Sequence, residues 1–304
     1  MTLSRSMIID TDAFWDPDDL LAITLAAMLV RRLTVITSNE TGGRRARGLR
    51  RFLNSLGRID VPVVAGCDLG DTHRFNCDDY IEDVPEQPAD VLGAVARACA
   101  AERAIWVGQG PLSNLANVLS AEPHRSDQLD VLAQGGWLDE YRDPSAATFN
   151  FRLDPAAAGL AVRAANGPRL VLSDWTNAEE MAVTRESDLF RIVSQPGAPE
   201  WARWIAICLE RWFDRKPSSK MHDPLTLSVA LGLPFVDFTD VRVRIEADAR
   251  LYRDRRGRLV RVANGVDYAG FMGWLCAIIE TGITEFDPGA ACLEAVARTA
   301  EVTA

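Results

Sequence analysis

Short apolar runs alternate with longer segments of helical periodicity along the first half of the chain. The runs have the length and β-branched content of buried strands, and they cover Met7–Ile9, Leu33–Thr37, Val61–Ala65, Ala104–Val107 and Val131–Ala133. The segments between them repeat apolar residues every three or four positions, as helices do, near 20–29, 44–56, 91–101 and 113–119. This alternation predicts an α/β fold with a mostly parallel, Rossmann-like sheet and helices on both faces.

The C-terminal third has a different pattern. Helical periodicity near 201–212 and 267–280 flanks a predicted β-hairpin, whose arms are 241–245 and 251–262 and whose turn is Arg255-Arg256-Gly257. Neither a Pro/Gly/Ser-rich linker nor an internal repeat interrupts the chain. We therefore expect residues 1–304 to form a single domain.

Composition and charge narrow the function classes. The net charge of −10 and the pI near 4.9 argue against a general affinity for nucleic acid or for an anionic membrane. Neither a signal peptide nor an apolar membrane span is expected, and the six scattered cysteines are typical of thiols in a reducing compartment. These features favour a cytoplasmic protein.

One basic segment stands out against this acidic background. Residues 43–51 read Gly-Arg-Arg-Ala-Arg-Gly-Leu-Arg-Arg, which would suit a phosphate-binding patch. The solvated face of an amphipathic helix explains the same pattern, and we favour that interpretation.

Five carboxylates lie within ten residues directly after the first predicted strand: Asp10, Asp12, Asp16, Asp18 and Asp19. At a strand end they would repel one another unless a cation lay among them, and oxygen ligands of this kind suit calcium. An acidic helix start would explain Asp18 and Asp19 but would leave Asp10 and Asp12 without a role. The segment therefore predicts a metal site.

Read together with four later segments, this one resembles the inosine-uridine preferring nucleoside hydrolase family. The family pattern of Asp-x-Asp, a short loop and Asp-Asp matches here, although the loop is two residues longer than usual. The other matching segments, in the family's order, are Gly108–Asn114, Gly135-Gly136 with Phe149-Asn150, Asp154–Ala158 and Met221–Leu225. The resemblance covers residues 7 to about 285, nearly the whole chain.

The resemblance implies a calcium site and a general base. Asp12, Asp19 and Asp223 would hold the ion together with the main-chain carbonyl of Gln109, where the family usually has threonine. Asp12 would also act as general base on a metal-bound water. The implied reaction is hydrolysis of the bond between a ribose and a nitrogenous base.

It also implies a substrate site. Asp18, Asn39 and Asn150 would bind the ribose hydroxyls. His222 would either protonate or orient the leaving base, or merely support Asp223. His73 follows the third strand near the place of a family site histidine, without the family's glycine-rich surroundings, so a site role and none are both open.

Two departures from the family pattern change the expected substrate. Arg142 and Thr148 stand where the family has an asparagine and a glutamate around the ribose 5′-hydroxyl. A guanidinium in place of a carboxylate suits an anionic 5′ group, such as a phosphate; alternatively, Arg142 points to solvent and the contact is lost. In the enlarged first loop, Phe14 and Trp15 could stack on the leaving base, although Trp15 could equally pack against a neighbouring helix.

Two other functions fit parts of the sequence. An apolar strand followed by Asp-x-Asp also begins haloacid-dehalogenase-type phosphatases, but Lys216 and Lys220, the only lysines, follow no predicted strand. A non-catalytic protein that binds a ribosylated ligand is the other alternative. The favoured partner is a small ribosylated molecule, and by family analogy the protein would be a homodimer or homotetramer.

Overall fold

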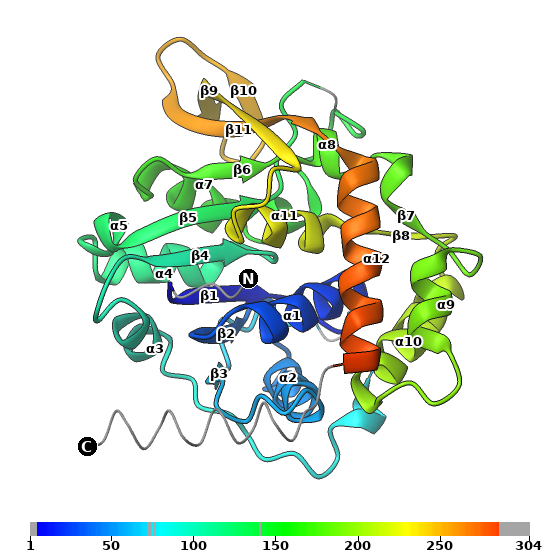
Figure 1. Cartoon of the computed structure of the whole chain (residues 1–304). Helices are drawn as coiled ribbons and strands as arrows, with labels where there is room; N and C mark the ends of the chain where they lie inside the picture. The colour runs from blue at the N-terminus through cyan, green and yellow to red at the C-terminus, as the bar shows by residue number, and fades with distance from the viewer. Residues whose placement is uncertain (1–4, 72–73, 76, 140, 286–304) are drawn as a thin grey trace.

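The computed structural model describes residues 5–71, 74–75, 77–139 and 141–285, and a nine-stranded sheet runs through this part of the chain (Figure 1). The strand order is β10-β9-β11-β6-β5-β4-β1-β2-β3. The strands are β1 (Met7–Thr11), β2 (Leu33–Thr37), β3 (Val63–Val64), β4 (Ala104–Gly108), β5 (Leu129–Gln134), β6 (Arg169–Val171), β9 (Val236–Ile245), β10 (Leu251–Arg253) and β11 (Arg258–Val266). A separate pair is formed by β7 (Ala182–Val183) and β8 (Ser219–Lys220).

Neighbouring strands from β11 to β3 pair in parallel, and only the pairs that β9 forms with β10 and β11 are antiparallel within this sheet. The predicted mostly parallel α/β sheet is therefore confirmed. The predicted hairpin is more divided than expected, because residues 254–257 split its second arm into β10 and β11. Both pieces pair with β9, and β11 joins the main sheet through β6.

Helices cover both faces of the sheet. The longer ones are α1 (Asp18–Leu29), α2 (Arg44–Ser55), α3 (Val91–Ala98), α4 (Ser113–Ala121), α7 (Pro155–Ala164), α9 (Asp188–Ser194), α10 (Glu200–Phe213), α11 (His222–Ala230) and α12 (Tyr268–Glu285). Short ones are η1 (Asp78–Tyr80), α5 (Arg125–Gln128), α6 (Phe149–Leu153), α8 (Ser173–Thr176) and η2 (Glu179–Met181). In the described residues no helix is both long and apolar enough to cross a membrane.

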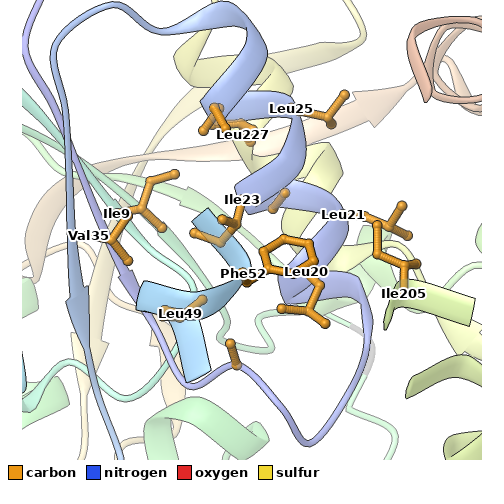
Figure 2. Close-up of a cluster of buried hydrophobic side chains, with 14 of the residues drawn as sticks. Ile9, Leu20, Leu21, Ile23, Leu25, Val35, Leu49, Phe52, Ile205 and Leu227 are labelled. Carbon is orange, nitrogen blue, oxygen red and sulfur yellow. The ribbon is translucent and has the colours of Figure 1, made fainter. Parts of the chain in front are cut away.

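Side chains of β1 alternate between two apolar cores, as the pleat of a strand requires. Met7 and Ile9 pack with α1, α2 and α9 to α12, whereas Ile8 packs with α3, α4 and α7 on the opposite face. Figure 2 shows Ile9 and Val35 on the side of α1 where Ile23 lies. Because residues 18–27 of α1 are all buried, this helix lies inside the molecule rather than on its surface.

The arginines of α2 are not a solvated face, so that interpretation of the basic segment is wrong. Arg45 is fully buried, and the other four arginines of the segment are half-buried. Arg47, Arg50 and Arg51 donate to main-chain carbonyls of loops that flank the helix. The segment therefore ties loops to the helix through charge-assisted hydrogen bonds.

Arg45 makes the most of these bonds. Its Nε donates to the carbonyl of Asn39 at 2.7 Å, and its terminal nitrogens donate to the carbonyls of Asp12, Ala13 and Arg74. One guanidinium thus joins the loops that follow β1, β2 and β3. These are the loops that carry the predicted site.

We expect Arg45→Met to lower the free energy of unfolding by about 3 kcal/mol or more, because it leaves several buried carbonyls without a donor. Arg31→Met is the matched control, since Arg31 is exposed, and its effect should stay within about 0.5 kcal/mol. Urea unfolding followed by circular dichroism measures both. Equal losses in the two variants would contradict the role given to Arg45.

Candidate active site

The strands of the central sheet end in register at one edge. Thr11 of β1 pairs with Thr37 of β2, and Asp10 of β1 pairs with Gly108 of β4. Residues that follow these strands therefore meet at the carboxyl edge, where open α/β sheets bind ligands. A cavity of about 530 Å³ opens there. Its lining includes Asp12, Asp18, Asp19, Gln109, Asn150, His222 and Asp223.

Three buried carboxylates meet at this cavity. Oxygens of Asp18, Asp19 and Asp223 all lie within 4.8 Å of one another. The main-chain N–H of Asp223 donates to Asp18 Oδ2 at 3.1 Å, and the Thr11 hydroxyl donates to Asp19 Oδ1. Packing of α1 against α11 brings residues about 200 positions apart into this cluster.

The environment of the cluster disfavours its negative charges. Burial raises the pKa values of Asp18, Asp19 and Asp223 well above the usual range, and repulsion from neighbouring aspartates, including Asp12 and Asp16, raises them further. Buried carboxylates of this kind need protons or a cation for compensation. The chemistry of the cluster therefore suits a divalent cation.

Asp12 lies beside the cluster and also lines the cavity. Burial raises the pKa of Asp12 to about 6, while the nearby Arg45 guanidinium opposes this shift. A Cβ atom at Gly110 would lie 3.1 Å from the Asp12 nitrogen and 2.2 Å from Ser38 Oγ. Glycine at position 110 therefore lets the loop after β4 approach Asp12 closely.

Gln109 connects two parts of the site. Its main-chain carbonyl, the predicted metal ligand, accepts from Asn150 Nδ2 at 2.9 Å. Its side-chain Nε2 donates to the main-chain carbonyl of Asp223, also at 2.9 Å. The side chain of Gln109 thus adds a direct bond to the start of α11.

The predicted ribose ligands fall into two groups. Asp18 and Asn150 line the cavity. Asn39 is fully buried with a φ of 46° and is not among the lining residues. Its side-chain amide atoms have no hydrogen-bond partner among the described residues. The ribose role of Asn39 stays a prediction, and His73 lies outside the described residues.

His222 is half-buried at the start of α11 and lines the cavity. Its Nδ1 lies 2.7 Å from the hydroxyl oxygen of Thr176, at the end of α8. Burial lowers the pKa of His222 to about 4, and the positive charges of Lys220 and Arg142 lower it further. The ring is therefore neutral near pH 7.

Arg142 and Thr148 both line the cavity. The Arg142 side chain is exposed and donates to Asn177 Oδ1 at 3.0 Å. The hydroxyl of Thr148 is buried and accepts from the main-chain N–H of Gly136 at 2.9 Å. The guanidinium is thus held at the rim of the cavity, whereas the Thr148 hydroxyl supports a neighbouring loop.

The two aromatic residues of the enlarged first loop lie in different environments, one at the cavity and the other in the core. Trp15 lines the cavity and packs edge-on against Trp212 of α10, with ring centroids 5.9 Å apart. Phe14 instead lies in the core against Phe75 and Tyr80, so the idea that it stacks on a base is wrong. The Phe14 ring packs directly against the backbone of α2 at Gly48, where a Cβ atom would lie 2.5 Å from the ring. Glycine at position 48 therefore makes room for Phe14 in the core.

Several lining residues were missed by sequence reasoning. They are Arg74, Gln134, Trp137, Arg152, Ser173, Asn177, Trp212 and Lys216, among others, while Asp16 of the predicted acidic segment also lines the cavity. Gln134 ends β5 and Ser173 follows β6, so the rule that ligands bind at strand ends could have found them. Trp212 and Lys216 follow no strand of the central sheet, and only the packing of α10 brings them to the cavity.

A family model, inosine-uridine preferring nucleoside hydrolase, matches residues 7–273 of the chain. The chain belongs to this nucleoside hydrolase family. Pyrimidine-specific ribonucleoside hydrolase RihA of Photobacterium profundum is 24% identical over 249 residues, which are 74% of this chain and 79% of that protein. RihA of Escherichia coli O7:K1 is 25% identical over 234 residues, covering 69% and 75% of the two chains.

Solved structures of similar proteins share the fold of this nucleoside hydrolase family member. The purine-preferring ribonucleoside hydrolase from Gardnerella vaginalis has a TM-score of 0.72 at 20% identity, covering 95% of this chain and 100% of that one. An inosine-uridine preferring nucleoside hydrolase from Bacillus anthracis has a TM-score of 0.70 at 16% identity, covering 91% and 99%. The predicted family and fold are therefore confirmed.

Membership in the nucleoside hydrolase family makes the chain an enzyme that hydrolyses the N-glycosidic bond of ribonucleosides. Neither the phosphatase nor the non-catalytic alternative has support from these matches. The similar proteins include a pyrimidine-specific and a purine-preferring hydrolase, so they favour no particular base.

Proposed function

We propose that this enzyme uses calcium to hydrolyse the N-ribosidic bond of a ribonucleoside or of a ribonucleoside 5′-phosphate-like substrate. The products would be the free base and ribose or ribose phosphate. The observation that carries the proposal is the cluster of buried carboxylates on the cavity wall. The relatives named above support the reaction type.

The donor set suits a hard cation. Asp19 and Asp223 of the buried cluster would hold calcium together with Asp12 and the carbonyl of Gln109, which line the same cavity. Asp18, the third member of the cluster, adds a further oxygen. All of these are oxygen donors, which calcium prefers, and the carboxylates offset its charge. When bound, the ion would polarise the attacking water and orient the ribose diol.

We expect calcium to raise the melting temperature of the chelator-treated enzyme by roughly 5 °C, corresponding to ~2.7 kcal/mol at a hundredfold excess over the dissociation constant. Asp223→Asn should abolish this rise. It should also leave the metal-free protein at least as stable as the wild type, because it removes one of the repelling charges.

Asp188→Asn is the matched control for that experiment, since Asp188 is an exposed carboxylate in α9. It should keep the full calcium response. Differential scanning calorimetry with and without a chelator measures all three proteins. A normal calcium response in Asp223→Asn would exclude Asp223 as a ligand.

Asp12 is the proposed general base. Its carboxylate lines the cavity, and its pKa of about 6 lets it stay ionised at neutral pH while remaining basic enough to take a proton from water. Asp18, Asn39 and Asn150 would bind the ribose hydroxyls. Carboxylates around the sugar would stabilise the positive charge that develops as the base departs.

The leaving base would lie toward His222 and Trp15. His222 would interact with the base, and Trp15, packed against Trp212, would offer an aromatic face. This arrangement gives the base apolar contact on one side and a polar ring on another. We propose a substrate role for both residues, and for His73 a role in the same region.

The proposal is tested by incubating calcium-loaded enzyme with matched ribonucleosides and ribonucleoside 5′-monophosphates and measuring released ribose or ribose phosphate. Asp12→Ala should reduce release by at least about a hundredfold, as expected for loss of a general base. In the same assay, Trp15→Ala with unchanged kcat and KM would remove Trp15 from the site. Absence of release from every pair would overturn the proposed substrate class.

An anionic 5′ group is favoured by the charges at the rim. Arg74, Arg142, Arg152 and Lys216 line the cavity, and Asp143 is the acidic lining residue nearest to Arg142 in the sequence. In a β-ribonucleoside the base and the 5′ carbon lie on the same face of the ribose. Arg142 lines the same cavity as His222, so we place the 5′ phosphate on the side of the ribose where this guanidinium could bind it.

We expect Arg142→Met to lower kcat/KM for a nucleoside 5′-monophosphate by about tenfold or more, with little effect on the parent nucleoside. Arg256→Met is the matched control, because Arg256 is an exposed arginine that does not line the cavity. Steady-state kinetics on both substrates measures the ratio. If wild-type enzyme cleaves nucleosides much faster than their 5′-phosphates, the anionic substrate is excluded.

Three coarser proposals accompany the reaction. One sheet collects strands from residue 7 to residue 266, which supports a single domain over residues 1–304. Family analogy supports a homodimer or homotetramer, which light scattering would distinguish from a monomer. The scattered cysteines support a cytoplasmic location.

A further inference from the structure

We propose that a directional chain of buried hydrogen bonds, ending at Thr176, fixes the proton of His222 on Nε2, so that the ring offers an N–H donor to the cavity. Thr176 is then a positioning residue that acts through His222. The identity of the acceptor, the leaving base, rests on the proposed function. The direction of the chain follows from the protein alone.

The chain begins at an atom whose role is fixed. The main-chain carbonyl of Gln109 can only accept hydrogen bonds, and Asn150 approaches it at 2.9 Å. The atom of Asn150 that makes this contact must therefore be its amide nitrogen. The carbonyl partner therefore decides which end of the Asn150 amide is nitrogen and which is oxygen, a choice that the shape of the side chain alone does not make.

The same nitrogen of Asn150 also fixes the orientation of the Gln134 side chain. Asn150 Nδ2 also lies 2.9 Å from the side-chain amide of Gln134, and a donor there requires the Gln134 oxygen. Gln134 Nε2 then faces the other way, toward the hydroxyls of Ser173 at 3.3 Å and Thr176 at 3.2 Å. Both hydroxyl oxygens consequently accept from Gln134.

Thr176 completes the chain. Its hydroxyl oxygen accepts from Gln134, so the hydroxyl proton is available for donation. Among the described residues, the remaining hydrogen-bond partner of this hydroxyl is His222 Nδ1, at 2.7 Å. Thr176 is fully buried, so water does not compete for this proton. His222 Nδ1 is therefore an acceptor, and a ring with an unprotonated Nδ1 carries its proton on Nε2.

The opposite arrangement, in which His222 Nδ1 carries the proton, would leave a buried donor without an acceptor. If His222 Nδ1 donated to Thr176, the buried hydroxyl would accept from both neighbours, and its own proton would have no acceptor among its partners in the described residues. Such unsatisfied buried donors are rare. Among the residues that the structure describes, none hydrogen-bonds to His222 Nε2, and His222 lines the cavity.

The functional consequence is a requirement on the substrate. An Nε2–H donor favours a leaving base that presents a lone pair of nitrogen or oxygen toward His222 as the ribosidic bond weakens. His222 would then help by donating a hydrogen bond to the departing base. Thr176 has no direct contact with the substrate in this scheme.

The test is nitrogen NMR of the histidine rings in full-length, calcium-loaded protein. The chain has only three histidines, so His73→Gln and His124→Gln assign the signals. In wild type we expect His222 to show a protonated Nε2 and an unprotonated Nδ1. Thr176→Val should remove this preference, and Thr176→Ser should retain it.

Kinetics supplies the second readout. Thr176→Val should lower kcat about tenfold, as removal of a residue that orients an active-site histidine commonly does, and Thr176→Ser should restore it. Thr24→Val is the control, because it removes a buried hydroxyl of α1 without touching the chain of bonds. Its kcat and His222 signals should match wild type.

A wild-type His222 with its proton on Nδ1, or on both nitrogens, would overturn the proposal. So would unchanged ring signals in a folded Thr176→Val protein. NMR detects the position of the proton without any turnover of substrate. Failure of the proposed reaction can therefore be told apart from failure of this proposal, because an enzyme inactive on every ribonucleoside could still carry the His222 proton on Nε2. Where Thr176→Val does not fold, the wild-type signals and Thr176→Ser alone decide.

Discussion

Repulsion among buried carboxylates is the constraint around which the carboxyl edge of the sheet is arranged. Asp18, Asp19 and Asp223 lie together where burial already disfavours their charge, and Asp12 adds to the repulsion. The fold counters part of this with the buried guanidinium of Arg45, which also holds three strand-end loops by their carbonyls. A site that binds a cation needs its ligands held in place before binding, and the bonds of Arg45 to these three loops serve that purpose.

The polar groups around this cluster form one connected system. Gln109 contacts both Asn150 and the main chain of Asp223, and Asn150 leads through Gln134 and Thr176 to His222. Asp223 and His222 are adjacent at the start of α11, so the system closes on itself. The residues proposed to hold the metal and the residue proposed to contact the base are therefore positioned by the same buried hydrogen bonds.

The sequence predicted the parts of the molecule in which local pattern and position agree. Apolar runs gave the central strands, and polar residues directly after them, such as Asp12 and Gln109, proved to line the cavity. Prediction failed where tertiary packing decides. Helical spacing puts Arg45 on the apolar face of α2 with Leu49 and Phe52, but the loop carbonyls that it binds come together only in the folded chain. Trp212 likewise reaches the cavity only through the placement of α10. The direction of a hydrogen-bond chain, likewise, exists only once its members are assembled.

The side chain of Gln109 has a consequence for how such a site can diverge. A residue that offers only its main-chain carbonyl could be exchanged freely, yet here the amide nitrogen also bonds to the carbonyl of Asp223. Threonine, which is shorter, would not span the same gap. Exchange of Gln109 for a shorter residue would therefore leave the Asp223 carbonyl without this donor, which couples the choice of side chain at position 109 to the placement of α11.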